Sequence, residues 1–198
     1  MFNKQLKIAV SITILFEIIL LGNAIFKLMS NQKDNISLLF EAMICILFPF
    51  IITYVSNKLK LILPSTFQTI SVIFVLLALY FGEYLKFYSK FWWWDLFLHG
   101  SFGCYGVIIA LHLIRGVIQK EKGISTGRFA VFSSIFAFCF SITIGTLWEI
   151  VEFLCDYFLN TDMVNGGLED TATDLIVKVI GAFITCIILY NTKLKKMK

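Results

Sequence analysis

Charged side chains are scarce in this chain. They make up 15% of its 198 residues, whereas hydrophobic residues make up 59%. Because soluble domains carry about a quarter of their residues as charged side chains, this composition excludes a water-soluble fold and indicates an integral membrane protein. Each spanning helix needs roughly 20 mainly apolar residues, which leaves room for about six helices, short loops and no separate soluble domain.

Several functional patterns are also missing. The basic residues give a net charge of +4 but form no run interleaved with aromatic residues, so the sequence predicts no nucleic-acid partner. The five cysteines include no C-x-x-C pair, which is typical of small packing residues. There is no nucleophile motif and no arginine clamp for phosphate, and a single suitably placed histidine excludes a di-iron bundle, which needs Glu-x-x-His on two helices.

What the chain has instead is apolar runs of membrane-spanning length. They predict six transmembrane helices, over residues 8–26, 37–56, 61–81, 92–114, 129–154 and 171–190. Pro49 predicts a kink inside the second of these helices. We therefore expect one all-α, multi-pass transmembrane domain over residues 1–198, with the lipid bilayer as its main partner.

The lysines and arginines outside the spans predict the orientation. If the spans alternate in direction, four basic residues fall on one side: Lys27, Lys33, Lys86 and Lys90. Twelve fall on the other side: Lys4, Lys7, Lys58, Lys60, Arg115, Lys120, Lys122, Arg128, Lys193, Lys195, Lys196 and Lys198. Since cytoplasmic loops carry the excess of basic residues, both termini are predicted to be cytoplasmic, in the cell (plasma or inner) membrane.

Acidic side chains and a histidine recur in pairs in the last three predicted helices. The pairs are Asp95 with His99, Glu149 with Glu152, and Asp170 with Asp174. Residues three or four apart share one helix face, and the predicted topology puts all three pairs near the outer face of the membrane. A carboxylate near hydrocarbon is costly unless it is protonated, paired or bound to a cation. These six residues therefore predict a divalent-metal site, whose oxygen-rich ligands suit Mg²⁺, Mn²⁺ or Ca²⁺, with Zn²⁺ possible in a smaller subset.

Some of these residues have a structural alternative. Asp95, Glu169 and Asp170 stand where helices are predicted to begin, where a carboxylate caps backbone N–H groups and favours the helix dipole. For Glu169 we prefer that interpretation. Glu149 and Glu152 lie near the predicted end of their helix, where the dipole disfavours anions, so capping does not explain them.

Other polar residues in the spans leave alternatives open. His99 lies four residues after Asp95, and this spacing supports a role as a metal ligand as well as it supports a packing role. His112 is expected to be a packing residue. Lys178 is interpreted as a structural counter-ion, with a proton carrier as the alternative. Glu17 is either a helix–helix hydrogen-bonding group or part of a proton path, and Glu41 is a further candidate for the acidic site.

The ordered motifs of the second half carry a resemblance. D-x-x-x-H is followed by W-E-x-x-E-F, then by D-T-x-x-D with G-A seven residues beyond its last aspartate. This combination, over about residues 90–190, resembles the YjdF-type family of bacterial integral-membrane proteins and, distantly, the VanZ-like proteins. The resemblance implies a compact multi-helix protein of the bacterial inner membrane and supplies no reaction. The chain departs from the family pattern at Ala172 and Thr173.

Two functions of different classes follow from the acidic cluster. One is a metal-dependent hydrolase or transferase at the outer leaflet, which acts on a lipid-linked or envelope substrate such as a phosphoester. The alternative is a small transporter or channel that uses the same acids to bind a cation or relay protons. A non-enzymatic envelope protein with a structural metal is a third interpretation. We favour the enzyme, because the acids gather at one face and no polar ladder crosses to the inside.

Overall fold

The computed structural model describes residues 4–30, 36–118, 122–159, 163–164 and 166–192. Within these residues all regular structure is helical and no strand occurs. Six stretches are long and apolar enough to cross a membrane, which confirms the predicted all-α fold with six spans. They are Lys4–Met29, Ile36–Lys58, Phe67–Tyr84, Trp94–Arg115, Thr126–Phe158 and Leu168–Thr192.

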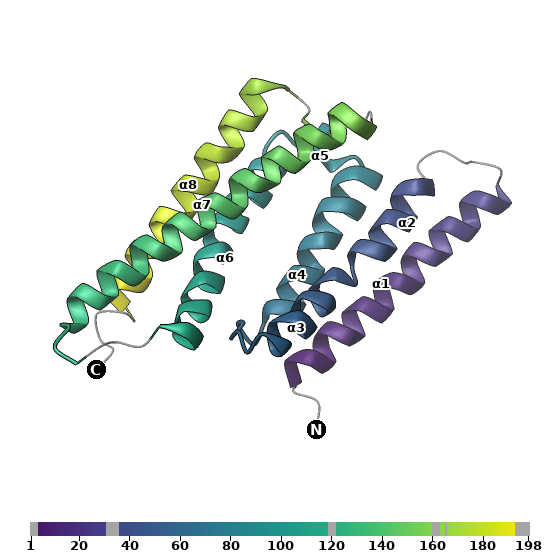
Figure 1. Ribbon diagram of the computed structural model, residues 1–198. Helices are drawn as coiled ribbons and strands as arrows, with labels where there is room; N and C mark the ends of the chain where they lie inside the picture. The colour runs from purple at the N-terminus through teal and green to yellow at the C-terminus, as the bar shows by residue number, and fades with distance from the viewer. Residues whose placement is uncertain (1–3, 31–35, 119–121, 160–162, 165, 193–198) are drawn as a thin grey trace. The chain divides into compact units, whose positions relative to one another are not determined.

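The chain divides into two compact units, Met1–Trp94 and Asp95–Lys198, and the single transmembrane domain over residues 1–198 stays a prediction. The first unit holds the helices α1 (Lys4–Met29), α2 (Ile36–Cys45), α3 (Phe48–Lys58), α4 (Phe67–Val75), the π-helix η1 (Leu76–Tyr84) and α5 (Phe87–Lys90). The second holds α6 (Trp94–Val117, whose first residue belongs to the first unit), α7 (Thr126–Leu159) and α8 (Leu168–Thr192) (Figure 1).

The first unit is built on α1, which packs along α2 and α4. Leu20 and Ala24 of α1 are buried against Leu39 and Ala42 of α2. A second buried cluster joins α4 and η1 to the α2–α3 connection: Ile46, Val72 and Leu76. These small apolar clusters leave the rest of each helix surface to lipid, as expected for a bundle inside a bilayer.

Two prolines move the helix boundaries of this unit. Pro49 lies in the first turn of α3, where its missing N–H is not needed, so the second span contains a break after Cys45 rather than a kink. The third span begins at Phe67, not at residue 61 as predicted. Pro64 precedes this span and restricts Leu63 to extended conformations, which delays the start of the helix. The Pro64 carbonyl accepts the Phe67 N–H at 2.9 Å.

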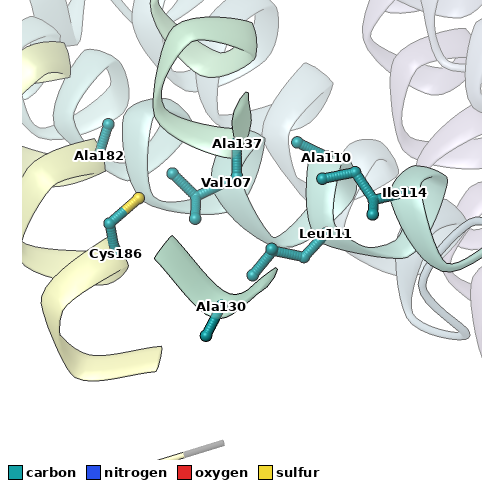
Figure 2. Close-up of a cluster of buried hydrophobic side chains, with 8 residues drawn as sticks. All are labelled: Val107, Ala110, Leu111, Ile114, Ala130, Ala137, Ala182 and Cys186. Atoms are coloured by element: carbon teal, nitrogen blue, oxygen red, sulfur yellow. The ribbon is translucent and has the colours of Figure 1, made fainter. Parts of the chain in front are cut away.

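In the second unit α7 and α8 lie side by side along their length (Figure 1). A cluster of buried residues joins them to α6 (Figure 2): Val107, Ala110, Leu111, Ile114, Ala130, Ala137, Ala182 and Cys186. Most of these side chains are small, which lets the three helix backbones approach closely.

Close approach of α6 and α8 depends on glycine. A Cβ at Gly103 would collide with the backbone carbonyl of Lys178, and one at Gly181 would lie 2.5 Å from the carbonyl oxygen of Gly100. Two hydrogen bonds tie α6 to its neighbours at this level. The Ser141 hydroxyl of α7 donates to the Gly103 carbonyl at 2.8 Å, and the Cys104 thiol donates to the Gly181 carbonyl at 3.4 Å.

Helix α7 is longer at both ends than the predicted helix over residues 129–154. It starts after Ser125, whose Oγ accepts the Arg128 N–H at 3.3 Å as an N-cap does. Its 34 residues span about 51 Å, against a hydrocarbon core of about 30 Å. Since α7 continues to Leu159, Glu149 lies about three turns before the end of the helix. The helix dipole acts mainly within the last turn, so it has little effect on Glu149. The dipole argument made for this residue from the sequence therefore does not apply.

Candidate metal centre

Five of the six predicted ligands converge at one end of the second unit. Asp95 and His99 occupy the first two turns of α6, Glu149 and Glu152 the later part of α7, and Asp174 the second turn of α8. Helices α6 and α8 begin at this end and α7 ends there. Antiparallel packing of α7 and α8 therefore brings the start of one helix beside the end of the other, which positions the acids together.

His99 lies at the centre of the cluster, and its side chain is almost completely buried. Its Nε2 is 3.0 Å from Oδ1 of Asp95, one turn earlier on α6, and 3.7 Å from Oδ2 of Asp174 on α8. Its Nδ1 faces the other way and lies 3.6 Å from Oε1 of Glu149 on α7. The imidazole thus faces carboxylates from three helices.

Lys178 provides the positive charge of the cluster. It is 2% exposed and forms an ion pair with Glu149, which is 5% exposed. The same ammonium group donates to the Gly145 carbonyl at 3.4 Å. The lysine stem packs against Gly145, where an added Cβ would lie only 3.0 Å from Cδ of Lys178. This is the arrangement expected of a counter-ion.

Glu152 lies at the edge of the cluster. The indole N–H of Trp148, an exposed residue of α7, donates to Oε1 of Glu152 at 2.6 Å. Asp95 is also only partly buried. These two carboxylates are the partly exposed members of the cluster, whereas His99, Glu149 and Asp174 are buried.

Asp174 is the most deeply buried acid of the described residues, at 1% exposure. Within the described part of the chain its Oδ1 is buried and has no hydrogen-bond partner. A buried, unsatisfied carboxylate oxygen is costly, so this atom points to a group that completes its coordination.

The ligand atoms form two overlapping groups in the described residues, and within each group they lie within 4.8 Å of one another. One group is Asp95, His99 and Asp174, and the other is His99, Glu149 and Glu152. Asp170 belongs to neither group, although it lies one turn above Asp174. It sits in the first turn of α8, where its carbonyl accepts the Thr173 hydroxyl at 2.9 Å. Its ligand role stays a prediction.

Other polar residues fall into simpler surroundings. Nδ1 of His112 lies 2.8 Å from the Ile108 carbonyl one turn before it, as a packing histidine would. Glu169 is exposed in the first turn of α8, where its charge favours the dipole. Glu17 and Glu41 belong to the first unit, where Glu17 lines a hollow of about 240 Å³ among apolar side chains of α1 and Met43.

Two residues beside the cluster were missed from the sequence. Asp156 accepts the backbone N–H groups of Met163 and Val164 at 2.7 and 2.8 Å, which fastens the connection between α7 and α8. Gly145 makes room for the lysine stem of α8. Gly145 lies four residues before Glu149, and Asp156 lies four residues after Glu152. All four residues therefore share one helix face, and helical periodicity could have identified Gly145 and Asp156 from the sequence.

Comparison with known proteins identifies relatives without an assigned reaction. The family described as "Predicted membrane protein (DUF2238)" matches residues 9–195. An "Uncharacterized protein" from Thermotoga maritima is 30% identical over 142 residues, which are 70% of this chain and 65% of that relative. The match thus spans slightly less than two thirds of the relative's own length. No solved structure matches the chain.

Proposed function

This chain belongs to the DUF2238 family of predicted membrane proteins, and on that premise we propose that its second unit binds a divalent metal ion within the cluster of candidate ligands Asp95, His99, Glu149, Glu152 and Asp174. Asp170 is a sixth candidate ligand. The observation that carries the proposal is the buried Oδ1 of Asp174, which lies beside His99 and Asp95 and has no hydrogen-bond partner among the residues that the structure describes. A cation among these carboxylates would offset charge that is otherwise costly to hold in a membrane helix.

The activity that suits this site best is metal-assisted hydrolysis or group transfer on a lipid-linked or envelope substrate. A bound divalent ion polarises a phosphoryl or carbonyl oxygen and lowers the pKa of a bound water. A carboxylate that does not hold the ion can accept the proton of that water. Asp95 and Glu152 reach the surface of the unit, which gives a lipid head group access to the site. The resemblance to YjdF-type and VanZ-like membrane proteins remains a prediction and supplies no reaction.

A metal analysis of the purified protein tests the proposal. After loading with Mn²⁺, Mg²⁺, Ca²⁺ or Zn²⁺ and removal of excess ion, we expect about one ion per chain in the parent protein. Asp174→Asn should lower this to near zero, because it removes a carboxylate ligand and keeps the side-chain volume. Glu169→Gln is the matched control, since it removes an exposed acid from the same helix. Equal metal content in the parent and in Asp174→Asn contradicts the proposed site.

The reaction is tested separately on the metal-loaded protein. We expect release of phosphate or head group from a lipid phosphoester in mixed micelles, with loss of activity after chelation and recovery after the ion is added back. A protein that binds the ion but turns over no lipid or envelope substrate would support a structural metal instead.

One observation favours the alternative, a small transporter or channel. The Glu149–Lys178 pair is a charged pair buried in a membrane-spanning helix pair, and such groups mark ion and proton pathways. Transport predicts that proteoliposomes accumulate the divalent ion or release protons when a gradient is imposed. Lys178→Met should abolish that flux. Proteoliposomes that pass neither the divalent ion nor protons would contradict the transporter and favour the enzyme.

A further inference from the structure

The two nitrogens of the His99 ring face chemically different surroundings. Nε2 faces Asp95 and Asp174, at 3.0 and 3.7 Å. Neither of these acids is paired with a lysine among the described interactions, and one oxygen of Asp174 lacks a partner there. Nδ1 lies 3.6 Å from Glu149, which is already in an ion pair with Lys178, and Glu152 completes the ligand group that His99 forms with Glu149. One side of the ring therefore has two carboxylates without an ion-paired ammonium group among the described interactions, whereas on the other side Lys178 neutralises one of two carboxylates.

The electrostatic energy of a bound cation differs between these two sides of the ring. An ammonium group in contact with Glu149 repels a second cation there, and the repulsion is strong in a poorly solvated interior. Lys178 is also held by the Gly145 carbonyl, so it is fixed toward α7. On the Nε2 side two carboxylates from α6 and α8 converge, and neither is ion-paired with a lysine among the described residues. The favourable position for a cation is therefore among Nε2, Asp95 and Asp174.

We propose that the ion is bound by Asp95, Asp174 and Nε2 of His99, and that Glu149 is a positioning residue which does not bind it. The inference rests on the proposed metal site and divides its candidate ligands. Glu149, held by Lys178, lies 3.6 Å from Nδ1 of His99, and a small turn of the ring would let Nδ1–H donate to it, which fixes the tautomer in which Nε2 presents its lone pair to the ion. Metal-binding histidines commonly donate their second N–H to a carboxylate, and loss of that carboxylate weakens metal binding by about 10- to 100-fold.

Co²⁺ titration of the detergent-purified protein tests the assignment, because visible absorption of Co²⁺ reports the number and type of its ligands. Asp95→Asn and Asp174→Asn each remove a ligand, so we expect about a 100-fold or greater loss of affinity and a changed spectrum. For Glu149 the informative variant is the double substitution Glu149→Gln with Lys178→Met, which removes both charges of the pair together and avoids a lone buried charge. We expect it to keep the parent spectrum while its affinity falls about 10- to 100-fold.

A second measurement reads the tautomer directly. Nitrogen NMR of histidine-labelled protein in a His112→Asn background should show His99 with a protonated Nδ1, and addition of the diamagnetic ion Zn²⁺ should shift Nε2. A double variant whose Co²⁺ spectrum shows one ligand fewer, or Zn²⁺ that shifts Nδ1, would overturn the assignment and make Glu149 a ligand. A parent protein that binds neither Co²⁺ nor Zn²⁺ would refute the metal centre itself. The two failures are thus distinguishable.

Discussion

At the scale of single residues, a lysine buried in a membrane helix is stable only when an acid neutralises it. Glu149 does this for Lys178, across the contact of α7 with α8. We expect Lys178→Met to lower the free energy of unfolding by about 3–5 kcal/mol, because Glu149 then remains buried without a counter-charge. Denaturant unfolding in detergent with a chelator present measures this effect.

The double variant Lys178→Met with Glu149→Gln separates the pair from mere packing. It leaves no uncompensated charge, so it should recover most of the stability lost in the single variant. Lys122→Met removes an exposed lysine and should stay within about 0.5 kcal/mol of the parent. A double variant as unstable as Lys178→Met would show that the uncompensated charge of Glu149 is not the cause of the lost stability.

Part of the site is readable from the sequence. Spacings of three and four residues predict which side chains share a helix face, and they selected Asp95, His99, Glu149, Glu152 and Asp174, which the structure brings together. Spacing cannot give the rotation of one helix against another. The choice of Glu149 as the partner of Lys178, and the exclusion of Asp170 from both ligand groups, depend on that rotation and on where α8 begins.

At the scale of elements, Asp156 shows how the last turn of α7 controls the connection to α8. Its two oxygens accept the N–H groups of Met163 and Val164. Hydrogen bonds to a charged group contribute about 1.5–3 kcal/mol, and 1.4 kcal/mol is a tenfold change in an equilibrium. Asp156→Ala should therefore accelerate hydrogen exchange of these two amides about tenfold or more. The control Glu169→Ala lies beyond the connection and should leave them unchanged, and equal exchange in both variants would contradict the role of Asp156.

The contact between α6 and α8 is set by the absence of a side chain at Gly103. In Gly103→Ala the added Cβ meets the backbone carbonyl of Lys178, which no rotamer change can relieve, so we expect a loss of about 1–3 kcal/mol and weaker metal binding. Gly127→Ala is the matched control on α7, since no atom lies within 4 Å of its Cβ position. It should be neutral or stabilising by up to about 1 kcal/mol. Thermal unfolding of both variants in the same detergent measures the difference in stability. Similar destabilisation by Gly103→Ala and Gly127→Ala would refute the packing argument.

Hydropathy locates the helices but not their ends. The six spans follow from the length of apolar chain that a bilayer requires, whereas their boundaries follow from backbone chemistry. Pro64 delays the third span, Pro49 breaks the second, and Ser125 starts α7 three residues early. The continuation of α7 to Leu159 was missed because the charged Asp156 interrupts the apolar run, although it does not end the helix.

At the scale of the whole molecule, the orientation in the membrane decides which substrates the site can meet. The positive-inside count predicts cytoplasmic termini and an outward-facing acidic cluster. Six of the basic residues in that count lie outside the described residues: Lys33, Lys120, Lys193, Lys195, Lys196 and Lys198. The orientation is therefore a prediction from the sequence, and α7 offers a direct test, because it runs from one predicted face to the other.

Single-cysteine labelling at the two ends of α7 measures this orientation. Asn165, in the connection to α8, lies outside the described residues, so we choose Leu168, which is 86% exposed at the start of α8, and Lys122 before α7. In a background without the five native cysteines, Leu168→Cys should react with an impermeant thiol reagent on intact cells. Lys122→Cys should react only after permeabilisation. The reverse pattern would turn the acidic cluster toward the cytoplasm, and substrates of the outer leaflet would then be excluded. Reaction of both positions from outside would show that α7 does not cross the membrane.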